Sequence, residues 1–251
     1  MRLGLMGAMP EEMDLIITSL QEKEIIEHGS RLFYTGKLYG QEVVAVFSRW
    51  GKVAAATTAT SLIVEFGVDS IVFTGVAGAI APDVNIGDIV VAQRLFQHDM
   101  DARPLMRRFE IPLTGKTSLE VLPRNQQLMA EAVHQFLKYN KDFRSKLSEH
   151  NIHNPKMVLG DIASGDLFIA TESMKQAISK NLPSVVCAEM EGAAVAQVCD
   201  DFGIPLTVVR VISDTANEED THRVMGFINK YAAMYNQAIL KEYMALLTEN
   251  I

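Results

Sequence analysis

Short apolar segments with the composition of buried β-strands recur along the chain, and most of them are separated by segments with helical periodicity. This alternation is typical of an α/β fold in which helices cover a largely parallel sheet. The segment Leu32–Ser48 instead alternates and turns at Tyr39–Gly40, which predicts an antiparallel hairpin. We therefore expect an α/β fold with a mixed central sheet flanked by helices.

The expected elements can be placed along the sequence. Strands are expected at Arg2–Met6, Ser70–Thr74, Gly87–Ala92, Lys156–Ser164, Ser184–Ala188 and Leu206–Ser213. Helices are expected at Met9–Leu20, Lys52–Gly67, Asn125–Tyr139, Ala170–Ser179 and Gly192–Gly203, with a C-terminal helix from about Thr221. The glycine-rich segment Gly75–Pro82 is expected to be a loop, and Asp99–Leu122 an irregular excursion.

Composition narrows the class of protein. The 251 residues contain no linker between dissimilar halves, so we expect one domain over residues 1–251. With 48% hydrophobic and 22% charged residues, the chain can bury a substantial core. The formal net charge of −8 argues against nucleic acid or an anionic membrane as a partner and favours a small-molecule ligand.

Location and redox state follow from simple patterns. The apolar part of MRLGLMGAMPEEM is too short for a signal peptide, and no later run reaches membrane-spanning length, so we expect a cytoplasmic protein. Cys187 and Cys199 lack CxxC spacing, which favours reduced thiols in the core.

Polar residues follow several of the expected strands. In open α/β sheets, ligands bind beyond the carboxyl ends of the strands. The segments at these ends are GAMPEE (7–12), GVAGA (75–79), SGDLF (164–168), EMEG (189–192) and SDTAN (213–217). Small and acidic residues at five strand ends predict a polar binding site at one edge of the sheet.

Arg210 lies inside an otherwise apolar strand, where a cation is costly unless it meets an anion. Its available partners are Glu12, Glu189, Glu191 and Asp214. Each residue also has a simpler explanation. Glu11 and Glu12 would favour a helix N-terminus, Asp214 would cap a loop, Arg210 would form a structural ion pair, and Phe168 would belong to the core. Their joint occurrence at strand ends favours the site.

Other motifs are incomplete. Gly75–Pro82 does not have the GxGxxG pattern, RWGKVA lacks the glycine and hydroxyl residue of a P-loop, and no GxSxG occurs. His98 in HDMD has no obvious third metal ligand, and His150 and His153 fall in a polar segment. We expect neither a metal nor another cofactor.

Eight ordered blocks between residue 4 and about residue 216 carry a family resemblance. They are GAMPEEM, RWGKVAAA, FTGVAGA, GDIVVA, QHDMD, SGDLFI, AEMEG and VVRVISDTA. With these blocks the chain resembles the nucleoside phosphorylase/nucleosidase superfamily, and within it the 5′-methylthioadenosine/S-adenosylhomocysteine nucleosidases. The resemblance implies hydrolysis of the N-glycosidic bond between adenine and a 5′-thio-substituted ribose. It implies that Glu12 activates water and that Asp214 protonates adenine N7.

The resemblance also implies binding roles. Glu191 would accept hydrogen bonds from the ribose hydroxyls beside the Met190 backbone, while Met9 and Trp50 would border the ribose and the 5′-thio group. Val76 stands near the ribose where the family commonly has serine.

On the adenine side, Phe168 would stack on the purine and the Ile169 backbone would read its edge. Ser213 would support Asp214, and Arg210 would help to hold the water and the acidic cluster. Phosphorolytic relatives hold phosphate near the first strand. The two carboxylates of MPEE would repel that dianion, so water is the expected nucleophile.

Some positions depart from the family pattern. Trp50 replaces a small aliphatic residue, and Val224 falls where a lid phenylalanine is expected. Leu105 is the nearest counterpart of an aromatic residue that many relatives lend across a dimer interface. The preferred 5′-substituent therefore stays open, with another adenine nucleoside such as aminodeoxyfutalosine, a phosphorylase, or a non-catalytic nucleoside-binding protein as alternatives. The resemblance also implies a homodimer.

Overall fold

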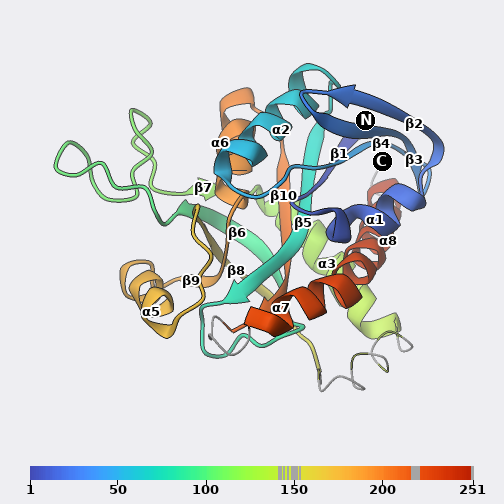
Figure 1. Ribbon diagram of the computed structural model, residues 1–251. Coiled ribbons are helices and arrows are strands. Elements are labelled where there is room, and N and C mark those ends of the chain that lie inside the picture. The colour runs from blue at the N-terminus through green and yellow to red at the C-terminus, as the bar shows by residue number, and fades with distance from the viewer. Residues whose placement is uncertain are drawn as a thin grey trace.

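The computed structural model describes residues 1–140, 143, 145, 147, 152, 154–215 and 221–249. Its strands are β1 (Arg2–Gly7), β2 (Gln21–His28), β3 (Arg31–Leu38), β4 (Gln41–Phe47), β5 (Ser70–Ala79), β6 (Ile89–Gln97), β7 (Leu119–Glu120), β8 (Met157–Ser164), β9 (Val185–Glu189) and β10 (Leu206–Asp214). Its helices are α1 (Pro10–Thr18), α2 (Lys52–Val64), α3 (Pro123–Tyr139), α5 (Glu172–Asn181), α6 (Gly192–Phe202), α7 (Thr221–Phe227), the π-helix η2 (Ile228–Ala232) and α8 (Ala233–Glu249). The expected alternation of strands and helices is confirmed (Figure 1).

The strands form one mixed sheet in the order β10-β6-β8-β9-β5-β1-β4-β3-β2, with β7 beside β6. Strand β10 also pairs in parallel with β5, so β5, β9, β8, β6 and β10 close on themselves like a small barrel. The parallel pairs β1–β5 and β5–β10 bring their carboxyl ends to the same edge. This arrangement places the ends of β1, β5 and β10 close together.

Strand β5 corrects one expectation, because it continues through Gly75–Ala79, the first part of the segment expected to be a loop. Gly78 and Ala79 pair with β9, and Val76 pairs with Val211 of β10. Hydrogen bonds to neighbouring strands on both sides therefore hold the glycine-rich segment extended in spite of its low strand propensity.

The hairpin expected in Leu32–Ser48 is confirmed as β3 and β4, which turn at Tyr39 and Gly40 with positive φ angles of 49° and 84°. Strand β2 is not predicted from the sequence, and its eight residues are all exposed. An edge strand without a buried face shows no apolar alternation, so its pattern resembles that of a surface loop.

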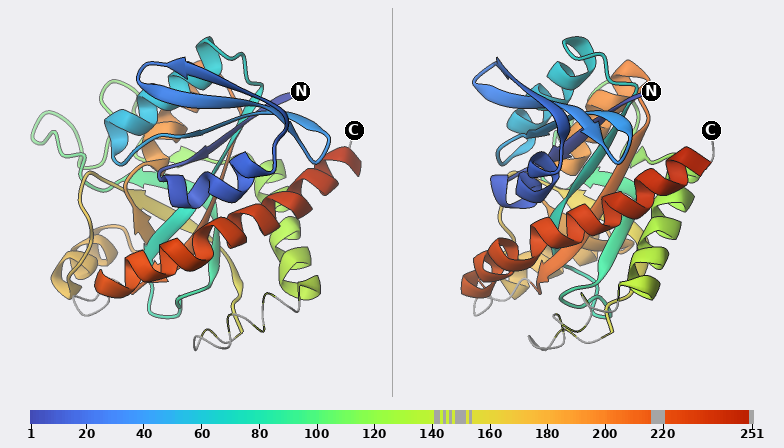
Figure 2. Two further views of the ribbon diagram at one scale, coloured as in Figure 1. Left: turned by 45° about the vertical axis from the view of Figure 1, so that its right-hand side comes forward. Right: turned by 90° about the vertical axis from the view of Figure 1, so that its right-hand side faces the viewer.

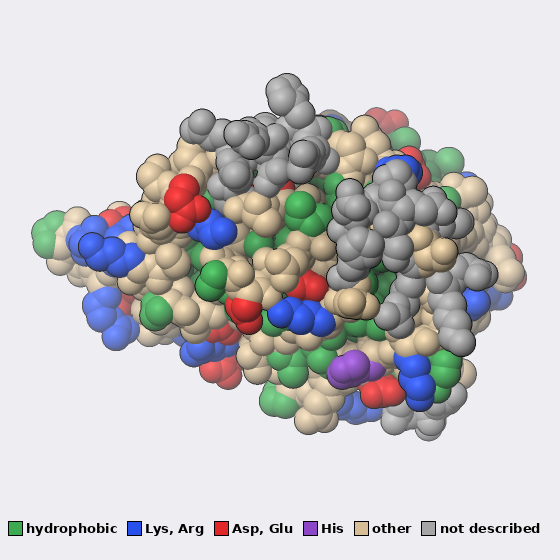
Figure 3. Space-filling view, turned by 90° about the horizontal axis from the view of Figure 1, so that it is seen from below, with side chains coloured by type: hydrophobic (Ala, Val, Ile, Leu, Met, Phe, Trp, Pro, Cys, Tyr) green, Lys and Arg blue, Asp and Glu red, His purple; other side chains and the backbone are tan. Residues whose placement is uncertain are grey.

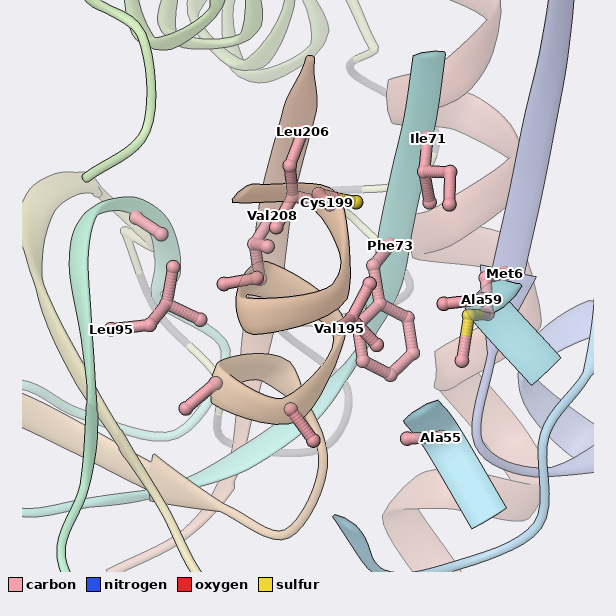
Figure 4. Packing of buried hydrophobic residues seen from close by; sticks show 14 of the residues in the cluster. Met6, Ala55, Ala59, Ile71, Phe73, Leu95, Val195, Cys199, Leu206 and Val208 are labelled. Carbon is pink, nitrogen blue, oxygen red and sulfur yellow. The ribbon is translucent and has the colours of Figure 1, made fainter. Parts of the chain in front are cut away.

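Helices cover the sheet from both sides. On one side, α6 packs against α2 and against β6, β8 and β10, and its Val195 and Cys199 share one apolar cluster with Phe73 and Val208 (Figure 4). On the other side, the long α8 lies beside α1 and α3 (Figure 2). Both cysteines are free and buried in the first of these cores, which confirms the expectation of core thiols.

Two residues mark helix ends as the sequence suggests, one at the end of α6 and one at the start of α5. Gly203 adopts φ 67° and ends α6, where a residue with a Cβ would be strained. The Thr171 side chain accepts a hydrogen bond from the Met174 N–H and caps α5. Between α7 and α8 the chain widens into the π-helix η2, a feature often found at functional sites.

The surface has no uniform basic face in the view from below, where cationic and anionic side chains are interspersed with hydrophobic ones (Figure 3). No helix in the described ranges combines the length and the apolar character needed to cross a bilayer.

Candidate active site

A cavity of about 350 Å³ opens where the ends of β1, β5, β9 and β10 meet. Four carboxylates line it, those of Glu12, Glu189, Glu191 and Asp214. The other lining residues are mostly small or apolar: Ala8, Met9, Trp50, Val76, Ala77, Gly78, Leu167, Phe168, Ile169, Ala188, Met190, Ser213, Val224, Met225 and Ile228. The structure thus brings together every predicted site residue except Arg210.

Glu12 is held rigidly at the start of α1. Only 2% of the residue is exposed. One carboxylate oxygen accepts hydrogen bonds from the N–H groups of Ala8 (2.7 Å) and Met9 (3.0 Å), and the other accepts one from Val76 (3.0 Å). Burial raises the pKa of Glu12, while the charge of Arg210 and these three donors act in the opposite direction. A buried carboxylate with a raised pKa suits a general base near neutral pH.

The glycines of β5 make room for the acidic side chains. A Cβ on Gly75 would lie 2.6 Å from Glu12 Oε1, and a Cβ on Gly78 would lie 2.9 Å from Asp214 Oδ1. Both distances are shorter than a carbon–oxygen contact allows. The spacing of Gly75 and Gly78 therefore lets two carboxylates approach one strand.

Gly75→Ala is expected to lower kcat/KM for the nucleoside cleavage that the family resemblance implies by about 10²-fold, because the new methyl group displaces Glu12 from its three donors. Steady-state assays with circular dichroism to check folding would measure this. Gly226→Ala adds the same methyl group where no heavy atom lies within 4 Å and should keep wild-type activity. Equal activity of both variants would show that the position of Glu12 is not critical.

Arg210 lies behind the cavity rather than in its wall, with 2% of the residue exposed. Its Nη2 donates to Glu189 Oε2 (2.9 Å), its Nη1 donates to the Phe73 and Val209 carbonyl oxygens, and its guanidinium covers the Phe73 ring. It acts on the other acidic residues through its charge and through Glu189. The expected ion pair is thus found with one glutamate of the cluster.

Glu189 ends β9 and anchors the start of α6. Its carboxylate accepts hydrogen bonds from the Glu191 and Gly192 N–H groups and from the Ser164 hydroxyl, in addition to Arg210. Because these donors surround it, the buried charge is compensated. The Glu189 carboxylate fixes the turn that presents Glu191.

Glu191 points its carboxylate into the cavity, and Oε1 accepts a hydrogen bond from the Gly51 N–H (2.8 Å). Burial first, and then the nearby Glu189 charge, raise the pKa of Glu191 to about 8. Gly51 was not among the predicted site residues. The glycine itself, which adopts a φ of 93° here, is the sequence signal that could have identified this turn.

Glu191→Gln should change the pH dependence of stability. The folded-state pKa lies above the unfolded value of about 4.5, so the folded protein binds the proton more tightly. The contribution of Glu191 to stability is then complete below about pH 4.5 and is lost as the pH rises through about 8. The free energy of unfolding, measured with urea, should decrease in the wild type relative to the variant as the pH rises across this range. A difference independent of pH would contradict the raised pKa.

Asp214 ends β10, is buried and lies against Gly78 of β5, whereas Glu12 lies against Gly75 of the same strand. The Ser213 hydroxyl lies 2.9 Å from Asp214 Oδ2 and within reach of the Ala77 carbonyl oxygen. A hydroxyl in this position orients the carboxyl group. Residues of β10 thus supply both the acid candidate and its support.

Apolar side chains form the remaining walls. Phe168, 48% exposed, and Ile169 follow β8, while Met9 precedes α1 and Met190 precedes α6. Trp50 is 62% exposed and lines the cavity from the turn before α2. Exposed aromatic rings at a cavity can cover a planar or apolar ligand.

A polar network that the sequence does not predict joins two of these loops. Asp166 accepts a hydrogen bond from the Lys52 N–H (2.8 Å), and its own N–H donates to Asp99 (3.0 Å). The Lys52 ammonium donates to Asp99 (2.7 Å). The loop with Trp50 is thereby tied to the loop with Phe168.

The positions that depart from the family pattern have different surroundings. Val76 contributes its backbone N–H to Glu12, a contact that does not depend on its side chain. Val224 is buried and lines the cavity. Leu105 is 87% exposed in the excursion and does not line the cavity.

The histidines give no metal site within the described part of the chain, where no group of three His, Cys, Asp or Glu side chains is arranged to hold a metal ion. His98 is buried beside Gly165, and burial lowers its pKa. His150 and His153 lie outside the described residues.

A family model described as the phosphorylase superfamily matches residues 2–245. The 5′-methylthioadenosine/S-adenosylhomocysteine nucleosidase of Colwellia psychrerythraea is 34% identical over 240 residues, covering 96% of this chain and 94% of the relative. The aminodeoxyfutalosine nucleosidase of Campylobacter jejuni is 33% identical over 241 residues, covering 96% and 97%.

Solved structures agree with this result. The crystal structure of a 5′-methylthioadenosine/S-adenosylhomocysteine nucleosidase from Colwellia psychrerythraea, in complex with adenine, aligns with a TM-score of 0.86 at 31% identity. The alignment covers 98% of this chain and 96% of that chain. The similarity therefore includes all the elements that form the cavity.

Proposed function

The chain belongs to the phosphorylase superfamily, and from this premise we propose that it hydrolyses the N-glycosidic bond of 5′-methylthioadenosine and S-adenosylhomocysteine. The products are adenine and the 5-thio-substituted ribose. The relatives of similar length that are named nucleosidases support this activity, as does the adenine bound to a structural neighbour.

Glu12 and Asp214 divide the proton transfers. Cleavage of the glycosidic bond passes through an oxocarbenium-like transition state, which needs an activated water on one side and protonation of the leaving base on the other. Glu12 takes the proton from water, and Asp214 protonates adenine N7. Their attachment to α1 and β10, at separate parts of one cavity, supports these roles.

The other lining residues position the substrate. Glu191 binds the ribose hydroxyls beside Met190, and Phe168 stacks on adenine, whose edge the Ile169 backbone reads. Ser213 orients the acid. Arg210 acts behind the wall by holding Glu189, which in turn fixes the turn that carries Glu191.

The remaining lining residues act on the sugar. Met9, Trp50 and Val76 border the ribose and the 5′-thio group. All three line the cavity, which supports their placement there.

The hydrogen bonds of Glu12 are the observation that favours water over phosphate as the nucleophile. Its carboxylate accepts hydrogen bonds from the N–H groups of Ala8 and Met9, which follow β1, and of Val76 in β5. Backbone N–H groups of this kind can bind a phosphate, but here they are already bonded to Glu12. A phosphate dianion would also be repelled by the ionised carboxylate of Glu12, which lines this cavity. Water, which is neutral, has neither disadvantage.

Chromatography of reaction mixtures in phosphate-free buffer tests the proposal. The purified protein would be incubated with 5′-methylthioadenosine, S-adenosylhomocysteine, adenosine or aminodeoxyfutalosine. Adenine released from the thio-nucleosides is the expected result. Tight binding of a nucleoside without release of adenine would instead indicate a non-catalytic binding protein.

Aminodeoxyfutalosine is the second candidate substrate, because the relative from Campylobacter jejuni matches this chain about as well as the methylthioadenosine nucleosidases do. The two substrates share the adenine and ribose end and differ at the 5′-substituent. Faster release of adenine from aminodeoxyfutalosine than from either thio-nucleoside would favour this candidate.

The biological setting is proposed on the same basis. The protein acts in the cytoplasm, in the salvage of methionine from thio-nucleosides, without a metal or other cofactor, on small molecules rather than nucleic acid or membranes. It forms a homodimer. Exposed Val53 and Leu105 are apolar side chains that such an interface would cover.

A further inference from the structure

A second, more open cavity of about 430 Å³ adjoins the active-site cavity. The two share four lining residues, Ala8, Met9, Trp50 and Met225. All four are apolar. The second cavity is completed by Pro10, Glu11, Phe47 and Arg49, which gives it one anionic and one cationic side chain.

Arg49 has an unusual backbone conformation. Its φ is 73°, in the left-handed region where non-glycine residues are uncommon. Strain of this kind is concentrated at ligand-binding sites. The conformation places Arg49 and Trp50 side by side in the wall of the second cavity.

The guanidinium of Arg49 has N–H donors that could bind a ligand. Within the described part of the chain it donates one hydrogen bond, from Nη2 to the Ser30 carbonyl oxygen (2.7 Å), whereas an arginine has five N–H donors. Neighbouring Arg31 likewise donates to backbone carbonyl oxygens. Burial and the charge of Arg49 lower the pKa of Arg31, so the two cations are close and an added anion would be favoured.

We propose that this second cavity binds the amino-acid end of a 5′-substituent, with Arg49 binding its carboxylate and Glu11 its ammonium group. The inference rests on the proposed function, which puts the 5′-thio group beside Met9 and Trp50. The shared apolar wall then suits the methylene chain between sulfur and the charged end. Arg49 and Glu11 are therefore specificity residues for S-adenosylhomocysteine, while 5′-methylthioadenosine does not reach them.

The test compares kcat and KM for S-adenosylhomocysteine with those for neutral 5′-butylthioadenosine, which has a chain of similar length. In Arg49→Gln, KM for S-adenosylhomocysteine should rise about five- to tenfold with kcat unchanged, because one charge-assisted contact is lost. KM for the butylthio compound should not change. Glu11→Gln should act in the same direction, and Arg49→Lys should restore part of the affinity because it keeps the charge.

Arg124→Gln is the matched control, since Arg124 is exposed on α3 and lines neither cavity. An unchanged KM for S-adenosylhomocysteine in Arg49→Gln, or an equal rise for both substrates, would overturn the inference. If the wild type released no adenine, the proposed function would fail instead. Calorimetric titration of S-adenosylhomocysteine into wild type and Arg49→Gln would then still test the subsite, because weaker binding to the variant supports it and equal binding refutes it.

Discussion

Replacement of Glu12 by glutamine is expected to lower kcat for adenine release by about 10²–10⁴-fold, the usual contribution of a general base. Glutamine preserves the size of the side chain, and its oxygen can keep the hydrogen bonds from the Ala8 and Met9 N–H groups while the one from Val76 is lost, so the fold should survive. The variant cannot accept the proton of water. Steady-state kinetics on 5′-methylthioadenosine would measure the loss.

The pH profile gives a second readout of the same variant. Because burial raises the pKa of Glu12, wild-type kcat/KM should fall as the pH decreases through a value above 4.5, where the carboxylate becomes protonated. The small residual activity of Glu12→Gln should lack this acid limb. Glu65→Gln, a change on the surface after α2, is the control and should keep both rate and profile. Activity of Glu12→Gln near that of wild type would refute its role as base.

Asp214→Asn is expected to have the second large effect, a decrease in kcat of about 10²–10⁴-fold. Asparagine retains the shape of the side chain and its contact with the Ser213 hydroxyl, but it cannot protonate adenine. Binding of the substrate should persist, so the loss should appear mainly in kcat.

Asp201→Asn, at an exposed position near the end of α6, is the matched control, since it makes the same chemical change away from the cavity. Calorimetric titration with adenine would show whether Asp214→Asn still has an intact site. Asp214→Asn with wild-type kcat would remove Asp214 from the mechanism. A variant that binds adenine and turns over slowly would support the assignment.

The sequence predicted most of the residues that line the cavity, because polar residues follow strands whose ends meet there. Glu12 and Asp214 come from distant segments, but they lie after β1 and at the end of β10, two strands that are parallel to β5. Glu191 follows β9, which runs antiparallel to β5 and pairs with its last two residues. A buried arginine required an anion nearby, and Glu189 is that anion. These inferences depend on the energetic cost of burying a charge. A charged residue within or next to an apolar strand is expected to be buried, and the sequence shows where such residues are.

The rest depended on contacts between distant segments. The glycine-rich segment Gly75–Ala79 has the composition of a loop, and only its pairing with β9 and β10 shows that it is a strand. The absence of Cβ atoms at Gly75 and Gly78 leaves room for the carboxylates of Glu12 and Asp214. Strand β2 has no buried face and so no pattern. The bonds from Gly51 to Glu191 and from Lys52 to Asp166 join residues more than a hundred positions apart, which periodicity cannot report.

The central claim is that this cavity uses water to cleave an adenine nucleoside, and the sugar product tests it most directly. The protein would be incubated with 5′-methylthioadenosine in the presence of phosphate, and the products separated by chromatography with mass detection. The account predicts free methylthioribose, formed at a rate that phosphate does not increase. Methylthioribose 1-phosphate as the product, with turnover that requires phosphate, would contradict it.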